Sequence, residues 1–174
     1  LGYEIMLPVD SAQAFWDALF EVGEPLGLIP AGAACVMMCR IEAGLIMGEV
    51  EYDHTMTPYE CRMAWSVDLN KDNFQGKEAL IEAQKNPLLD IVSVILPGEG
   101  EYDGVELMDN NKKVGLVTMA IPSPYLDGKF IGLARINRAN ATVGNKLDLS
   151  LEGNGQVEIV ATPVYDPERI KSRS

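Results

Sequence analysis

The sequence predicts an α+β fold in which a mixed region of strands and helices precedes an antiparallel β-barrel or sandwich. Apolar residues recur at helical or alternating spacing through residues 1–88, and from about residue 88 onward short apolar runs are separated by turn signals. Short strands with frequent turns and no helix-length period are typical of antiparallel all-β domains. We therefore expect two domains, residues 1–88 and 89–174.

The first region begins with a predicted strand and a helix. Tyr3–Leu7 alternates between apolar and polar residues, as a half-buried strand does. Asp10 followed by Gln13 resembles a capping box, which starts a helix. The helix is expected to end at Gly23, and its apolar face carries Phe15, Leu19 and Val22.

Three further elements are predicted before the second region. Residues 31–45 are rich in small and sulfur-bearing side chains and predict a closely buried helix, and residues 73–86 predict a short amphipathic one. Residues 57–69 alternate like a strand, which would place Trp65 in the core.

The second region predicts six strands. The apolar runs lie at residues 88–96, 104–109, 114–121, 130–136, 145–152 and 156–165. Turn signals separate them, among them DNNKK, SPYLDGK and the GNG of residues 153–155. This spacing predicts the antiparallel barrel or sandwich.

Composition excludes several classes of function. The 174 residues are 47% hydrophobic and carry a net charge of −12, which disfavours a nucleic-acid partner because such binding depends on Lys and Arg. No apolar run approaches the roughly 20 residues needed to span a bilayer, and LGYEIML is too short and acidic for a signal-peptide core. We expect a cytoplasmic protein with no membrane partner.

The cysteines and the one histidine give no metal site. Cys35, Cys39 and Cys61 are predicted to be buried free thiols in a reducing compartment. CVMMC offers too few ligands for zinc, and His54, in a polar turn, is expected to face solvent. No residue near His54 in sequence would shape it into a general base.

Several stretches, taken in order, resemble the C-terminal half of the glycine cleavage T-protein family. The family includes aminomethyltransferases and related folate-dependent demethylases. The stretches are GYEIMLP, the helix with Trp16, CRIEAGL, EYDHTMTPYE, AWSVDLNKDNFQGKEAL, VGLVTMAIPSPYLDGKFIGLARI and VYDPERIKSR. The resemblance implies the C-terminal part of a ferredoxin-like α+β folate-binding domain, followed by an antiparallel β-barrel domain.

The resemblance also implies an activity and partners. It implies a tetrahydrofolate-dependent one-carbon transferase, either aminomethyltransferase-like or demethylase-like, in which folate lies between domains and meets a small one-carbon donor. An N-terminal half carrying a catalytic aspartate would be missing, so the catalytic residue is unknown here. Exposed apolar surface at a severed edge would favour self-association.

The resemblance assigns three folate-binding residues: Glu4, Arg40 and Tyr165. A carboxylate such as that of Glu4 accepts two parallel N–H bonds from the aminopyrimidine edge of a pterin. From alternation alone, Glu4 would simply occupy the polar face of a strand. Arg40 is also open to a structural role, paired with Glu42 or a backbone carbonyl, and Tyr165 to a place at the end of a strand.

The sequence departs from the family pattern at Val36, where glycine-cleavage members carry an arginine at the substrate cavity. That change removes a charge partner for an anionic ligand group. The anionic tail of folate would need a local basic patch, for which Lys129, Arg135 and Arg138 are the candidates. A non-catalytic folate-binding or regulatory module, and a protein-interaction domain that has lost the ligand, are the alternatives.

Overall fold

The computed structural model describes residues 2–151, 155–168 and 170, which form two compact units. The first unit is Leu1–Ala33 and the second is Ala34–Ser174. Within the described ranges, no helix combines the length and the apolar character that crossing a membrane would require.

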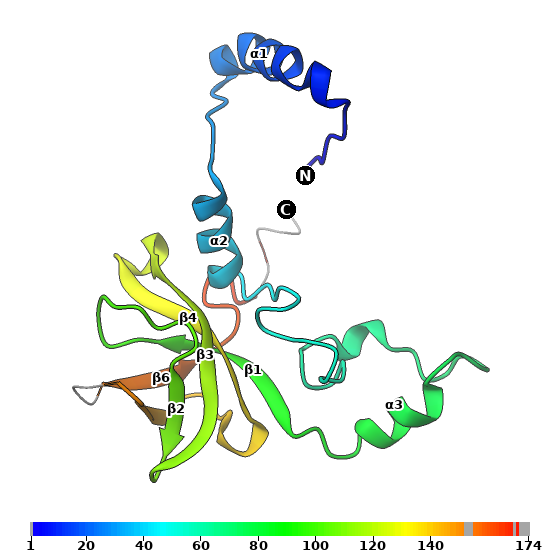
Figure 1. Ribbon diagram of the computed structural model, residues 1–174, viewed down its shortest axis with the longest axis vertical. Helices are drawn as coiled ribbons and strands as arrows, with labels where there is room; N and C mark the ends of the chain where they lie inside the picture. The colour runs from blue at the N-terminus through cyan, green and yellow to red at the C-terminus, as the bar shows by residue number, and fades with distance from the viewer. Residues whose placement is uncertain (1, 152–154, 169, 171–174) are drawn as a thin grey trace. The chain divides into compact units, whose positions relative to one another are not determined.

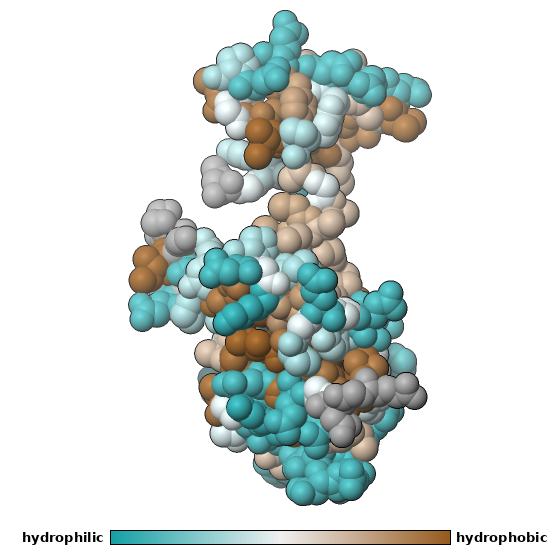
Figure 2. Space-filling model, turned by 90° about the vertical axis from the view of Figure 1, so that its left-hand side faces the viewer, coloured by the Kyte–Doolittle hydropathy of each residue, from teal (hydrophilic) through white to brown (hydrophobic). Residues whose placement is uncertain are grey.

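The first unit consists of one helix with short 3₁₀ turns at its ends. The helix α1 spans Ala12–Gly23, as predicted, between 3₁₀ turns at Val9–Ser11 and Glu24–Leu26. The capping box predicted at its start is not formed, because Gln13 donates instead to Asp17 at 2.8 Å. No residue of α1 is buried, and Figure 2 shows apolar side chains at the surface of this unit.

The strand predicted at Tyr3–Leu7 is wrong. These residues have no regular secondary structure, and Tyr3 is 82% exposed. A strand needs a neighbour that pairs with its backbone N–H and C=O groups. The described part of the first unit contains no second extended segment that pairs with it.

The second unit is built on a closed antiparallel barrel, as predicted (Figure 1). Its strands hydrogen-bond in the order β1-β4-β3-β2-β5-β6, and β6 pairs back with β1. Their bounds are Leu89–Ile95 for β1, Glu106–Asp109 for β2, Lys112–Ser123 for β3, Lys129–Asn137 for β4, Lys146–Leu149 for β5 and Gln156–Val160 for β6. Of the predicted GNG turn, residues 153 and 154 lie outside the described residues.

The barrel has one apolar core inside and a second on its outer face. All six strands contribute buried residues to the inner core, among them Val94, Val117 and Ile159. The outer core joins Ile91, Ile131 and Leu133 of the strands to Ile41 and Cys61 of the preceding chain. The outer core covers β1, β3 and β4, whereas β5 and β6 alternate between buried inward and exposed outward side chains.

Two helices precede the barrel. The helix α2 spans Ala33–Glu42, and its last turn is buried against the barrel. The helix α3 spans Lys77–Ala83, carries no buried residue and lies outside the barrel (Figure 1). Both are shorter than the predicted ranges 31–45 and 73–86.

The strand predicted at residues 57–69 is also wrong. The segment forms turns and a 3₁₀ helix at Ala64–Ser66, and Arg62 has a φ of 61°, which interrupts an extended chain. Trp65 is 85% exposed rather than in the core, and His54 is exposed as expected. The apolar alternation of this segment is satisfied locally, because Cys61 and Met63 pack into the outer core without forming a strand.

Gly132 on β4 allows close packing of β3, and its substitution gives a first prediction. A Cβ placed there would lie 2.7 Å from the carbonyl oxygen of Met119. We expect Gly132→Ala to lower the free energy of unfolding by roughly 1–3 kcal/mol, because the strands must separate to admit the methyl group. Urea unfolding followed by circular dichroism measures this change.

Gly98→Ala is the matched control, because a Cβ at Gly98 meets nothing within 4 Å. Its effect should stay within about 0.5 kcal/mol. Equal effects of the two substitutions would contradict the close approach of β3 and β4 at Gly132.

Candidate functional site

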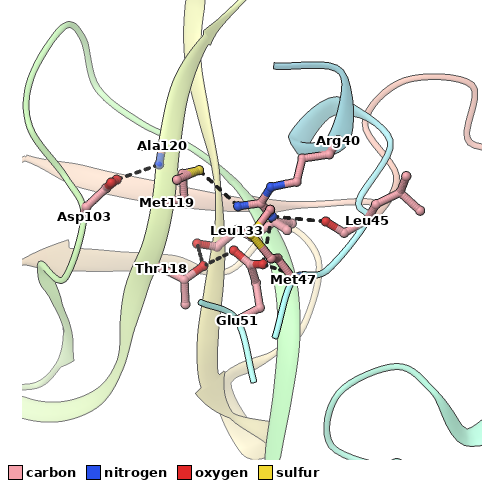
Figure 3. Close-up of polar contacts among 9 residues, drawn as sticks. All are labelled: Arg40, Leu45, Met47, Glu51, Asp103, Thr118, Met119, Ala120 and Leu133. Atoms are coloured by element: carbon pink, nitrogen blue, oxygen red, sulfur yellow. Dashed lines mark hydrogen bonds and ion pairs between the residues drawn. The ribbon is translucent and has the colours of Figure 1, made fainter. Parts of the chain in front are cut away.

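A buried ion pair joins α2 to the chain that follows it. Arg40 is 6% exposed and Glu51 is fully buried, and Arg40 Nη1 lies 2.8 Å from Glu51 Oε2. The same carboxylate accepts the backbone N–H of Met47 at 2.8 Å and the hydroxyl of Thr118 at 3.0 Å (Figure 3). A buried charge is tolerated only when it is paired and hydrogen-bonded in this way.

The guanidinium of Arg40 is occupied on two further sides. Nη1 also donates to the carbonyl of Leu45 at 3.1 Å, and Nη2 lies 3.0 Å from the sulfur of Met119 (Figure 3). Nε is buried and has no hydrogen-bond partner within the part of the chain that the structure describes. Arg40 is thus anchored as the structural interpretation expected: it donates to a backbone carbonyl, that of Leu45, and its acidic partner is Glu51 rather than Glu42.

A β-bulge in β3 brings Thr118 to Glu51. The register between β3 and β4 shifts between Val117 and Met119, so Thr118 is left out of the ladder. A bulge redirects the side chain of the extra residue. The Thr118 hydroxyl consequently lies within hydrogen-bond distance of both Glu51 and the carbonyl of Leu133, 2.9 Å away.

The last residue of α2 holds the turn between β3 and β4. The carboxylate of Glu42 accepts the hydroxyl of Ser123 at 2.5 Å and the backbone N–H of Tyr125 at 3.1 Å. Its backbone carbonyl accepts the N–H of Tyr165 at 2.8 Å, and the rings of Tyr165 and Tyr125 meet edge to face, 4.9 Å apart. The structure therefore brings two predicted site residues, Arg40 and Tyr165, to the same end of α2.

The other predicted site residues do not join this cluster. Glu4 is exposed and belongs to the first unit. Val36 lies in the first half of α2 and is 57% exposed. Cys35 and Cys39 are exposed free thiols rather than buried ones, whereas Cys61 is buried as predicted. Cys35 and Cys39 are exposed because the first turns of α2 do not pack on the barrel and carry no buried residue.

The basic patch predicted from Lys129, Arg135 and Arg138 is not assembled. Lys129 begins β4 and Arg135 lies six residues further along it, which separates them by roughly 20 Å at 3.3 Å per residue. Arg135 instead pairs with Asp53 at 2.9 Å, and Arg138 donates to the carbonyl of Tyr59. Each of the two arginines therefore holds the loop before the barrel.

Asp53 is a strongly acidic carboxyl. The hydroxyl and the backbone N–H of Thr55 donate to it, and with Arg135 they lower its pKa from 3.8 to about 2. Its carboxylate is therefore charged at neutral pH. It keeps the loop around residue 53 tied to β4.

Glu60 fastens the loop to the start of β1. Burial by itself would raise the pKa of Glu60, but the N–H groups of Thr57, Leu88 and Leu89 and the Thr57 hydroxyl outweigh it, and the pKa is lowered. The carboxylate thus accepts hydrogen bonds from backbone N–H groups that lie before the paired part of β1. Like Asp53, it favours the folded state at neutral pH, and this contribution is lost in acid.

Sequence reasoning missed Glu51, Thr118 and Glu60 as organising residues. Thr57 and Glu60 have the spacing of a capping box, which could have revealed their bonds. Glu51 and Thr118 are 67 residues apart, and no local pattern announces their pairing. Among the described residues there is no group of three or more His, Cys, Asp or Glu that could hold a metal ion.

The fold and these contacts define an α+β protein. A helix and a loop that is anchored by acidic side chains pack on the outer face of its barrel. The family model "GCVT N-terminal domain" matches residues 1–71, and "Glycine cleavage T-protein C-terminal barrel domain" matches residues 91–166. The chain belongs to the glycine cleavage T-protein family.

Named relatives agree with this assignment. The chain is 36% identical to the trimethylamine-oxide aldolase of Ruegeria pomeroyi, covering 100% of this chain and 23% of that protein. It is 34% identical to the aminomethyltransferase of Thermotoga maritima, covering 94% of this chain and 45% of that protein. The chain therefore spans less than half the length of these relatives.

A solved structure supports the fold. The aminomethyltransferase T of the glycine cleavage system from Bartonella henselae superposes with a TM-score of 0.80. The match covers 91% of this chain and 45% of that protein, at 24% sequence identity. At this identity the likeness establishes the shared fold.

We predict that breaking the buried ion pair is costly. Arg40→Met or Glu51→Gln alone should lower the free energy of unfolding by roughly 3–5 kcal/mol, because each leaves a buried charge without its partner. The double variant Arg40→Met with Glu51→Gln should cost less than the sum of the two single substitutions. Urea unfolding of all variants measures these values.

The exposed pair of Glu82 and Lys85 is the control, and Glu82→Gln should change the free energy of unfolding by less than about 1 kcal/mol. Single substitutions at the buried pair that cost no more than this control would show that the pair does not organise the loop.

The acidity of Asp53 gives a further prediction. Thr55→Val removes the hydroxyl donor and should move the pKa of Asp53 from about 2 upward toward 3.8. Because the folded pKa lies below the unfolded one, the stability that Asp53 contributes is full above about pH 3.8 and is lost as the pH falls toward 2. Carbon-detected NMR titration of the carboxyl group measures the pKa directly. An unchanged pKa in the variant would assign the effect to Arg135 instead.

Proposed function

We propose that this chain takes part in tetrahydrofolate-dependent one-carbon transfer, with folate held between its domains. The observation that carries the proposal is the ordered family match, which runs from the GYE stretch containing Glu4 to the C-terminal barrel. Relatives named aminomethyltransferase and trimethylamine-oxide aldolase support chemistry on small amines.

In this proposal, Glu4 recognises the pterin. Its exposed carboxylate is free of bonds to other described residues and can accept a pair of N–H bonds from the aminopyrimidine edge. Tyr165 contributes an aromatic wall near the end of α2, where its ring meets that of Tyr125. Arg40 acts mainly by holding α2 on the barrel, since its guanidinium is already engaged by Glu51.

The chain's main contribution is then positioning. Catalysis of this kind depends on bringing N5 of the folate to the donor carbon, and a fixed geometry replaces an encounter of two free molecules. The proton-handling aspartate of the family has no assigned counterpart in this chain. We propose that it belongs to the part of the relatives' length that this chain does not span.

Val36 favours a second candidate, a folate-binding or regulatory module without transferase activity. A valine cannot pair with an anionic group where the family has an arginine. The same change equally suits a transferase that acts on a donor without a carboxylate. The two candidates differ in turnover and not in folate binding.

Two further expectations belong to this proposal. We place the functional domain boundary between residues 88 and 89, and the two family matches fall on either side of it. We also propose a cytoplasmic protein whose partners are tetrahydrofolate and a small one-carbon donor, with self-association through exposed apolar surface.

The test is an anaerobic titration of tetrahydrofolate into the chain. Binding is measured by calorimetry and by the fluorescence of Trp16 and Trp65. We expect saturable binding that Glu4→Gln weakens by about tenfold, which corresponds to about 1.4 kcal/mol for a charge-assisted hydrogen-bond pair. Glu21→Gln, an exposed glutamate of α1, is the matched control and should leave binding unchanged.

The same titration is repeated after the first half of the Thermotoga maritima aminomethyltransferase has been added as a separate polypeptide. Binding by neither preparation would overturn the folate proposal. Binding without formation of a one-carbon folate from an amine donor, in both preparations, would select the non-catalytic module.

A further inference from the structure

A groove lies on the outer face of the barrel, and none of the residues that bond to Arg40 lines it. Its volume is about 420 Å³, and it opens between the loop near residue 53 and strands β1, β3 and β4. Residues that line it include Asp53, Leu89, Lys113, Leu116, Arg135 and Asn137. In the strand register, Leu116 lies opposite Arg135 and Leu89 opposite Asn137. Apolar and polar side chains therefore alternate across its floor.

The groove presents donors that are partly unused. Arg135 uses only Nη1, toward Asp53 and the sulfur of Met56, which leaves Nε and Nη2 without an acceptor among the described residues. The Arg135 side chain is 27% exposed, so this edge is reachable from solvent. Asp53 already holds the guanidinium of Arg135 by its other edge. Arg135 therefore loses less conformational freedom when a ligand binds.

The net charge of the residues that line the groove is opposite in sign to that of the whole chain. Its charged lining residues are Lys113, Arg135 and Asp53, which sum to +1, whereas the whole chain carries −12. Lys113 is shared with Glu106 at 2.6 Å, in a pair that is about half exposed and therefore easily exchanged for a ligand. A monoanion matches this balance better than a doubly charged phosphate does.

We propose that this groove binds a small carboxylate with an apolar body, with its carboxylate on the free edge of Arg135 and beside Lys113. The planar guanidinium fork matches the two oxygens of a carboxylate. The body of the ligand would cover Leu89 and Leu116, which are half-buried, and Asn137 is placed to bond a polar substituent. The inference stands on the groove alone and does not require the proposed folate activity.

The test is an NMR titration of the full chain with benzoate, read from backbone amide shifts. We expect saturable shifts centred on Leu116, Arg135 and Asn137. Arg135→Lys keeps a charge for Asp53 but removes the fork, and it should weaken binding by about tenfold. Lys113→Gln should weaken it by about threefold, because it removes a charge at an exposed site.

Lys112→Gln is the matched control, because Lys112 carries the same charge one residue away but does not line the groove. It should leave the affinity unchanged. The amide spectrum of each variant also shows whether it is folded, and Lys113→Gln tests the proposal even if Arg135→Lys is destabilised. The proposal is overturned by shifts that do not saturate, or by equal effects of the two lysine substitutions.

A second arm uses p-aminobenzoylglutamate, the carboxylate-bearing half of folate. Binding at least tenfold tighter than benzoate, with the same dependence on Arg135, would identify the groove as a seat for the folate tail. Binding no tighter than benzoate would assign the groove to a separate small carboxylate. The Glu4→Gln titration tests the pterin site independently, so failure of one proposal leaves the other open to its own test.

Discussion

The second unit depends on one buried ion pair. Arg40 lies in the last turn of a helix whose first turns carry no buried residue, and Glu51 lies in a loop without regular secondary structure. Both segments place apolar side chains in the outer core, Ile41 from α2 and Met56 and Cys61 from the loop. The ion pair adds a directional constraint, because a buried carboxylate must keep its charged and hydrogen-bonding partners. The bulge at Thr118 completes the set of donors, so a departure from regular β-structure in the barrel accommodates a charge from outside it.

The same logic extends along the loop from residue 43 to residue 63. Asp53 is fixed to β4 by Arg135, and Glu60 is fixed to the start of β1 by backbone N–H groups. A net charge of −12 would suggest a repulsive surface, yet these acids are the groups that hold the loop in place. Carboxylates suit this task because each can accept several N–H bonds from chain that has no ladder partner. Ion pairs and hydrogen bonds to carboxylates consequently position the loop, whereas the helices and strands follow from apolar periodicity.

This difference explains what could be predicted from the sequence. The strands of the barrel and α1 were predicted because their apolar periodicity is local. The strands at residues 3–7 and 57–69 were predicted wrongly because alternation records which side chains are apolar, not whether a backbone partner exists. Arg40 and Tyr165 were singled out through the family resemblance, but the partner of Arg40 was not. Its pairing with Glu51 spans 11 residues and that of Glu51 with Thr118 spans 67, so no helical or strand period records either.

The two units differ in what can stabilise them. The barrel buries residues on both of its faces, whereas the described part of the first unit contains no buried side chain. A helix of 12 residues is marginal in water without a surface to pack on. Phe15, Trp16 and Leu19 stay 38–51% exposed within this unit, although the rings of Trp16 and Phe20 lie 4.7 Å apart. Glu4, which we propose for pterin recognition, lies in the unit whose described residues contain no buried side chain, whereas Arg40 and Tyr165 lie in the unit that holds both apolar cores.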